Sequence, residues 1–98
     1  EFSQYPAVEH DLAIVVDNAV TCEDLERRIT SAGGKLLEGV RLFDVYRDPI
    51  RIGAGKKSMA FALTYRSDDH TLTSEEVEKA HQKIVTKVCK GVNGEVRG

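Results

Sequence analysis

Two segments of the chain alternate bulky with small side chains, the pattern typical of a half-buried β-strand. They span 11–17 and 58–66. Because successive side chains on a strand point to opposite faces, we expect one bulky, buried face and one open face of small residues. The bulky set is Leu12, Ile14, Val16, Met59, Phe61, Leu63 and Tyr65, and the small set is Ala13, Val15, Ser58, Ala60, Ala62 and Thr64.

A further strand is predicted between these two, over 36–46, with a bulge or twist at Gly39. Strict alternation gives Leu42, Asp44 and Tyr46 one parity and Phe43 and Val45 the other. A carboxylate and an aromatic ring therefore point the same way, and we expect both on the open face. A planar ligand fits a surface of this kind, although a solvated charge beside an ordinary edge aromatic explains the pattern equally simply.

Two helices are predicted from their start signals. Thr21 with Asp24, and Thr73 with Glu76, have the spacing of a capping box. Glycines predict the ends, at Gly33-Gly34 for the first helix and at Gly91 for the second. The apolar stripes are Leu25, Ile29 and Ala32 in the first helix, and Val77, Ala80, Ile84, Val85 and Val88 in the second.

The remaining segments complete the predicted order of strand, helix, strand, strand, helix, strand. The stretch 47–57 contains Pro49, Gly53 and Gly55, which predict an irregular, mobile loop, and 95–97 gives a weak fourth strand. This order predicts an α+β, ferredoxin-like split βαβ fold: a four-stranded antiparallel sheet with both helices on one face and the other face open. We expect one domain over 5–98, preceded by a tail or cloning remnant at 1–4.

Charge is distributed unevenly along the 98 residues. The chain carries a net charge of -2, which argues against general polyanion binding, yet 41–66 carries +4 and the remainder -6. This asymmetry indicates an anionic partner at one edge of the domain, or a solvated loop whose cations maintain solubility. Cys22 and Cys89 have no metal-ligand spacing, and no apolar run could span a bilayer. We expect a cytoplasmic protein with reduced thiols, although a disulfide between the two cysteines stays open.

Catalytic chemistry has little support in the sequence. His10, His70 and His81 fall in separate elements, without the carboxylate or thiol spacing of a metal site or of a nucleophile with its base. We interpret them as strand-edge, loop and helix-flank residues, and expect no metal and no catalytic residue. An acylphosphatase-like enzyme would need an arginine loop beside an asparagine, and Asn18 and Asn93 lie at unsuitable positions.

Several motifs together resemble one family. YPAVEHDLAIVVD, GGKLLEGVRLFDVYRD, GAGKKSMAFALTYRS and HTLTSEEVEKAHQKIV are similar to the ferredoxin-fold anticodon-binding domain at the C-terminus of the bacterial phenylalanyl-tRNA synthetase β subunit. The resemblance runs from Tyr5 to Arg97. It implies a non-catalytic module of an α2β2 ligase that attaches phenylalanine to tRNA(Phe), with ATP and magnesium used elsewhere in the enzyme.

The resemblance also implies an anticodon site on the open face. Guanine at the first anticodon position offers two adjacent donors that the Asp44 carboxylate can accept, and Tyr46 would stack on a base. Glu9, His10 and His70 replace basic residues that are common in the family. A protein-docking or small-molecule regulatory domain, using the same sheet face to dimerise, stays open as an alternative. The implied RNA-binding residues are Ala13, Asp44, Tyr46 and Ser58, with Arg47, Lys56 and Lys57 near phosphates.

Overall fold

A computed structural model describes residues 5–97 of the chain, so the predicted tail at 1–4 lies outside the described residues. The predicted order of elements is confirmed, with one additional helical turn between the second and third strands. The elements are β1 (Val8–Asp17), α1 (Cys22–Gly33), β2 (Leu37–Tyr46), the turn η1 (Pro49–Gly53), β3 (Lys56–Tyr65), α2 (Ser74–Val92) and β4 (Glu95–Val96).

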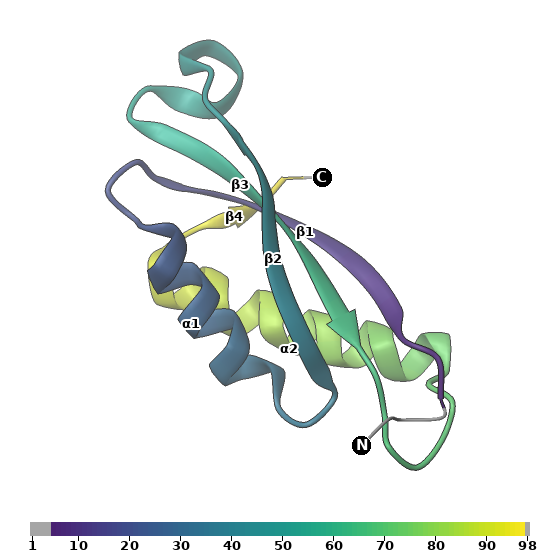
Figure 1. Ribbon diagram of the computed structural model, residues 1–98. Coiled ribbons are helices and arrows are strands. Elements are labelled where there is room, and N and C mark those ends of the chain that lie inside the picture. The colour runs from purple at the N-terminus through teal and green to yellow at the C-terminus, as the bar shows by residue number, and fades with distance from the viewer. Residues whose placement is uncertain (1–4, 98) are drawn as a thin grey trace.

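The strands form one antiparallel sheet in the order β2-β3-β1-β4. Both helices pack on the same side of it, and the ends of β2 and β3 that carry η1 project beyond them (Figure 1). The predicted ferredoxin-like α+β fold is therefore confirmed. β1 begins three residues earlier than predicted, and β4 pairs with β1 only at Ile14 and Val15.

The core lies between the sheet and the helices, where the predicted bulky face meets the two apolar stripes. Ile14, Phe61 and Leu63 are fully buried, whereas Ala13 and Val15 on the other face are half-buried. Burial of such side chains is the main source of stability, at about 1.5–3 kcal/mol for each large aliphatic or aromatic group. The buried core comprises Leu12, Ile14, Val16, Leu25, Ile29, Met59, Phe61, Leu63, Tyr65, Leu72, Val77, Ile84 and Val88.

The two helix starts differ in how they are capped. Thr73 and Glu76 form the predicted reciprocal capping box at the start of α2. At the start of α1, Thr21 accepts the predicted bond from the Asp24 backbone N–H at 3.1 Å. The Asp24 carboxylate, however, accepts from Arg27 and Arg28 on the next turn, so the prediction of a box there is corrected to a simple Thr cap.

The predicted end of α2 at Gly91 is wrong. The helix continues to Val92 and is capped by Asn93, whose φ of 54° lies in the left-handed region and whose N–H donates to the Cys89 carbonyl. Gly91 instead lets the Arg28 guanidinium of α1 approach, since a Cβ there would lie 2.6 Å from Nη1. A glycine in a helix can therefore mark a close packing contact as well as an end.

His81 is also placed differently from the prediction of a helix-flank residue. Its side chain is 6% exposed, and its Nδ1 lies 2.9 Å from the Tyr65 hydroxyl. Burial lowers the pKa of His81, with a further contribution from nearby His10, and burial raises the pKa of Tyr65 to about 12. Cys22 and Cys89 are free thiols, which answers the open question of a disulfide between them.

Candidate nucleic-acid interface

The four predicted base-contacting residues lie in two adjacent rows across the open face. Asp44 on β2 pairs with Ala60 on β3, which in turn pairs with Ala13 on β1. In the next row Tyr46 pairs with Ser58, which pairs with Val15. Facing residues in antiparallel strands have Cβ atoms about 4.5–5.5 Å apart. The structure therefore brings Ala13, Asp44, Tyr46 and Ser58 together on the face that the helices leave uncovered.

Asp44 and Tyr46 reach this face through a bulge that the sequence pattern did not reveal. The register of β2 against β3 shifts between Leu37 and Gly39, as predicted, and again between Leu42 and Asp44. The second shift puts Leu42 opposite Phe61 and against the core, so the prediction that it points the same way as Asp44 and Tyr46 is wrong. Phe43 occupies the bulge and is 49% exposed. Bulges reorient the side chains that follow them, and here the reoriented residues are Asp44 and Tyr46.

The floor of this face is only partly accessible. Asp44 is exposed and Ala13 and Ala60 are half-buried, but Ser58 is 2% exposed. The expectation of a low, open floor therefore needs correction at Ser58 and at Ala62, which is 3% exposed. A base could reach this serine only after the groups that cover it moved.

Tyr46 is held in place by the helical turn that follows it. Its hydroxyl donates to Asp48 Oδ2 at 2.9 Å. The other oxygen of Asp48 accepts from the backbone N–H groups of Ile50 and Arg51 at the start of η1. The hydrogen bond to Asp48 raises the pKa of Tyr46. The pKa of Asp48 is lowered, mainly by the hydrogen bond from the Arg51 backbone N–H and next by the one from the Tyr46 hydroxyl. Residues 47–57, expected to be irregular, thus contain a capped turn, and their mobility stays a prediction.

The three predicted cations do not share one surface. Arg47 is exposed, and its Nε donates to Asn18 Oδ1 at 3.1 Å. Lys56 is exposed on the same face of β3 as Ser58, and it pairs with Asp17 of β1. Lys57 is the second residue of β3 rather than part of the loop, has the parity of the core residues and is 8% exposed. Its predicted place beside RNA phosphates is corrected on these grounds.

Two residues of this face were missed by the sequence reasoning. Asp48 precedes Pro49, and an Asp before a Pro at the first helical position is a helix-start signal that could have been recognised. Arg97 lies at the far edge of the sheet, and its guanidinium carbon is 4.7 Å from the centre of the Tyr46 ring. No local sequence pattern could have predicted that contact, because 50 residues separate Tyr46 from Arg97 in the chain.

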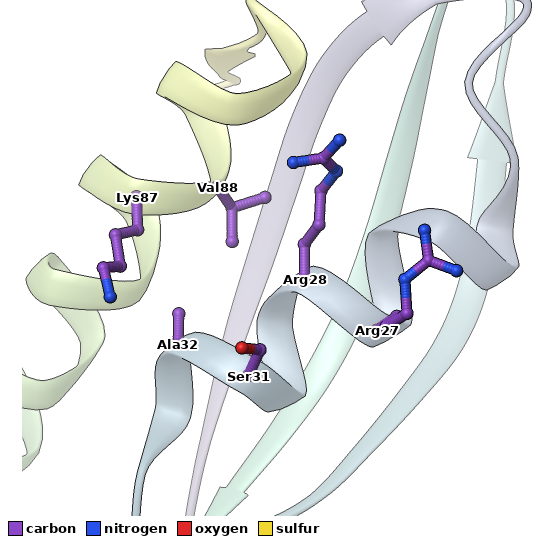
Figure 2. A pocket seen from close by; sticks show the side chains of 6 residues that line it. All are labelled: Arg27, Arg28, Ser31, Ala32, Lys87 and Val88. Carbon is purple, nitrogen blue, oxygen red and sulfur yellow. The ribbon is translucent and has the colours of Figure 1, made fainter.

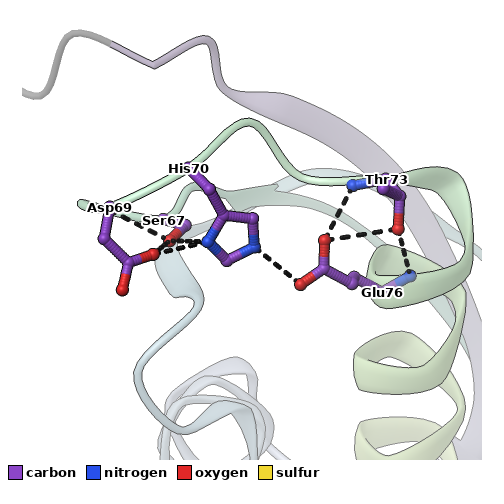
Figure 3. A network of polar contacts seen from close by, with 5 residues as sticks. All are labelled: Ser67, Asp69, His70, Thr73 and Glu76. Carbon is purple, nitrogen blue, oxygen red and sulfur yellow. Dashed lines mark hydrogen bonds and ion pairs between the residues drawn. The ribbon is translucent and has the colours of Figure 1, made fainter.

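A second polar cluster, at the start of α2, serves the fold. His70 Nε2 lies 2.7 Å from Glu76, which also completes the capping box with Thr73 (Figure 3). On its other side, His70 Nδ1 lies 2.5 Å from Asp69 and 3.2 Å from the Ser67 hydroxyl (Figure 3). The hydrogen bonds to Asp69 and then to Glu76 raise the pKa of His70. The serine, histidine and carboxylates resemble a nucleophile with its base, but Ser67 is 7% exposed and the network ties the loop to α2.

A cationic hollow lies on the opposite side of the molecule, between α1 and α2 (Figure 2). It has a volume of about 500 Å³ and is lined by Arg27, Arg28, Ser31, Ala32, Lys87 and Val88. Asp24 pairs with both arginines, so much of the positive charge is compensated locally. The hollow is separated from Asp44 and Tyr46 by the thickness of the core.

Within residues 5–97, no three His, Cys, Asp or Glu side chains gather in a way that could hold a metal ion. No helix in the same part of the chain is long and apolar enough to cross a membrane. The sheet order and the position of both helices on one side define a ferredoxin-like α+β domain whose other sheet face is free of helices.

Comparison with known proteins shows the family. The model of the ferredoxin-fold anticodon binding domain matches residues 3–97, and the chain belongs to this family. Among curated proteins, the chain is 45% identical over 94 residues to a phenylalanine–tRNA ligase β subunit of Clostridium tetani. The matched region covers 96% of this chain and 12% of that protein. It is 47% identical over 94 residues to the β subunit of Symbiobacterium thermophilum, a match that covers 96% of this chain and 10% of that protein. It is 50% identical over 82 residues to the β subunit of Bacillus subtilis, where the match covers 84% of this chain and 10% of that protein. The chain therefore spans about a tenth of the length of these relatives.

Proposed function

We propose that this domain binds the anticodon of tRNA(Phe) on its open sheet face, as one module of a phenylalanine–tRNA ligase β subunit. The observation that carries the proposal is that two adjacent rows of paired residues cross this face. Asp44, Ala60 and Ala13 form one row, and Tyr46 and Ser58 belong to the next. Its support is the family membership together with the names of the similar proteins. In that enzyme, of α2β2 composition, catalysis with ATP and magnesium would belong to the α subunit.

The chemistry of the proposed site follows from the base to be read. The Watson–Crick edge of guanine presents adjacent imino and amino donors, and the exposed Asp44 carboxylate has two acceptor oxygens to receive them. Tyr46, fixed by Asp48, offers a ring for stacking. Ala13 and Ala60 are small, so a base can lie against the backbone of the sheet beside Asp44. Lys56, exposed on the same face of β3 as Ser58, and Arg47, exposed directly after β2, would attract the RNA phosphates.

The decisive experiment compares guanine with adenine at the first anticodon position. We expect Asp44→Asn to weaken binding of a guanine stem-loop by about 1.5–3 kcal/mol, the scale of hydrogen bonds to charged groups. The asparagine amide places a donor against a guanine donor, so one of the two bonds is lost. An adenine stem-loop, which lacks the donor pair, should bind wild type and variant alike. Isothermal titration at one fixed salt concentration would measure all four affinities.

Asp68→Asn provides the matched control, because it removes the same charge from an exposed loop beyond the far end of β3. It should leave both affinities unchanged. If Asp44→Asn weakened both RNAs equally, the carboxylate would be acting through general electrostatics and its base-reading role would be rejected. A tight dimer through the sheet in sedimentation experiments, unaffected by RNA, would favour the docking-domain alternative.

A further inference from the structure

Arg97 and Tyr46 make contact across the whole width of the sheet. Tyr46 ends β2 at one edge, and Arg97 follows β4 at the other, with β3 and β1 between them. The Arg97 backbone N–H donates to the Ala13 carbonyl at 2.9 Å, which continues the pairing of β4 with β1. The guanidinium carbon nevertheless lies 4.7 Å from the centre of the Tyr46 ring. Three strand spacings amount to about 14 Å, so both side chains must lean inward over the central strands.

Ser58 lies close to the path of this contact across the sheet. Ser58 lies on β3, between Tyr46 of β2 and Val15 of β1, on the face without helices, and is only 2% exposed. Arg97 bonds to Ala13, which pairs with Ala60, whereas Tyr46 pairs with Ser58, so the contact crosses β3 in the region of Ser58 and Ala60. The phenol ring and the guanidinium therefore meet over the rows that contain the proposed site.

The two groups are anchored differently. The Tyr46 hydroxyl is hydrogen-bonded to Asp48, which in turn caps η1, so the ring is fixed at its far end. Arg97 extends from a strand of two residues and has a long side chain with several rotatable bonds. When the face opens, Arg97 is the group that can move, while the ring keeps its place.

We propose that Arg97 is a base-stacking residue of the RNA site: an unstacked nucleobase enters between the Tyr46 ring and the Arg97 guanidinium and is covered on both faces. Single-stranded RNA bases stack on aromatic rings and on guanidinium planes, and arginine adds a cation–π attraction. The guanidinium carbon already lies over the Tyr46 ring at 4.7 Å, so a base can enter once the two groups separate by the thickness of a ring. This inference rests on the proposed function and adds Arg97 to the residues implied there.

The test uses three variants and two RNAs, the anticodon stem-loop of tRNA(Phe) and the same stem-loop with an abasic first anticodon position. We expect Arg97→Ala to weaken binding of the intact stem-loop about tenfold, the scale of losing one stacking partner. Arg97→Lys keeps the charge but lacks the plane, so it should lose nearly as much. Lys83→Ala removes one positive charge from an exposed position of α2 and should change nothing. The abasic stem-loop should bind wild type and both Arg97 variants alike.

The outcomes separate this inference from the proposed function. Wild-type affinity for Arg97→Lys would reduce Arg97 to a phosphate contact and overturn its stacking role. Tighter binding by Arg97→Ala would make Arg97 only a competitor for the ring and would also overturn it. If the wild-type domain bound the intact and the abasic stem-loops with equal affinity, the proposed function would be overturned, and with it the role of Arg97. Amide NMR spectra of each variant would verify that the fold is retained.

Discussion

The Tyr46 hydroxyl donates a hydrogen bond to the carboxylate of Asp48, two residues further along the chain, and the same carboxylate caps the helical turn η1. One side chain therefore fixes both the proposed stacking ring and the loop beside it. This arrangement ties the geometry of the open face to a single local motif at the end of β2.

Replacing Asp48 should consequently affect two separate observables. Asp48→Ala removes a helix cap and is expected to lower the free energy of unfolding by about 1 kcal/mol. It should also lower the pKa of Tyr46 towards its ordinary value, because the hydrogen bond to Asp48 is the main cause of the raised pKa. Urea unfolding and a ¹³C NMR titration of the tyrosine ring carbons would measure the two effects. Asp48→Asn keeps a capping oxygen and should retain most of the stability.

The buried pair of Tyr65 and His81 gives a prediction about stability alone. Tyr65→Phe leaves the ring in the core but removes the partner of His81 Nδ1, 2.9 Å away. A buried polar atom without a partner costs about 1–3 kcal/mol, and we expect this loss in urea unfolding at neutral pH. Affinity for the anticodon stem-loop should be unchanged, since the pair lies on the helix side of the sheet. A variant as stable as wild type would contradict a stabilising role for this bond.

His70 should make the start of α2 sensitive to pH. Its pKa is raised from 6.5 by Asp69 and Glu76, so the folded state binds the proton more tightly than the unfolded state does. The stabilisation is therefore fully present below about pH 6.5 and is lost as the pH rises through the higher folded-state pKa. His70→Gln should abolish this dependence. Histidine ring NMR titrations, with unfolding measured at several pH values, would detect it, and a folded-state pKa at or below 6.5 would contradict it.

Salt dependence should distinguish the two lysines at the start of β3. RNA affinity falls with salt in proportion to the number of phosphates contacted, by about 0.7 in the logarithmic slope for each contact with a single strand. Lys56→Gln is expected to reduce the slope by about this amount, because Lys56 is exposed on the proposed RNA face. Lys57→Gln is the matched control, since Lys57 is 8% exposed on the helix side, and should keep the wild-type slope. Equal effects of both substitutions would argue against the assigned surface.

Much of this fold follows from local sequence patterns. The alternation of bulky and small residues in β3 determines which side is buried, because side chains on a strand alternate between faces. Thr21 and Thr73 mark helix starts because their hydroxyls satisfy backbone N–H groups that a helix leaves unpaired. The same alternation predicted the face of Ala13 and Ser58, and the register confirms that these residues lie together with Asp44 and Tyr46.

Other features were decided only by tertiary contacts. The bulge at Phe43 interrupts the alternation of β2, so Leu42 packs against the core although strict alternation pointed it the same way as Asp44. His81 is polar by type but becomes a core residue because Tyr65, from another element, supplies its partner. Arg97 meets Tyr46 because β4 and β2 belong to one sheet and both side chains lean over its open face, although the two strands lie at opposite edges. Local sequence determines propensity and alternation, whereas contacts between distant residues depend on the register and order of strands, which form only when the whole chain folds.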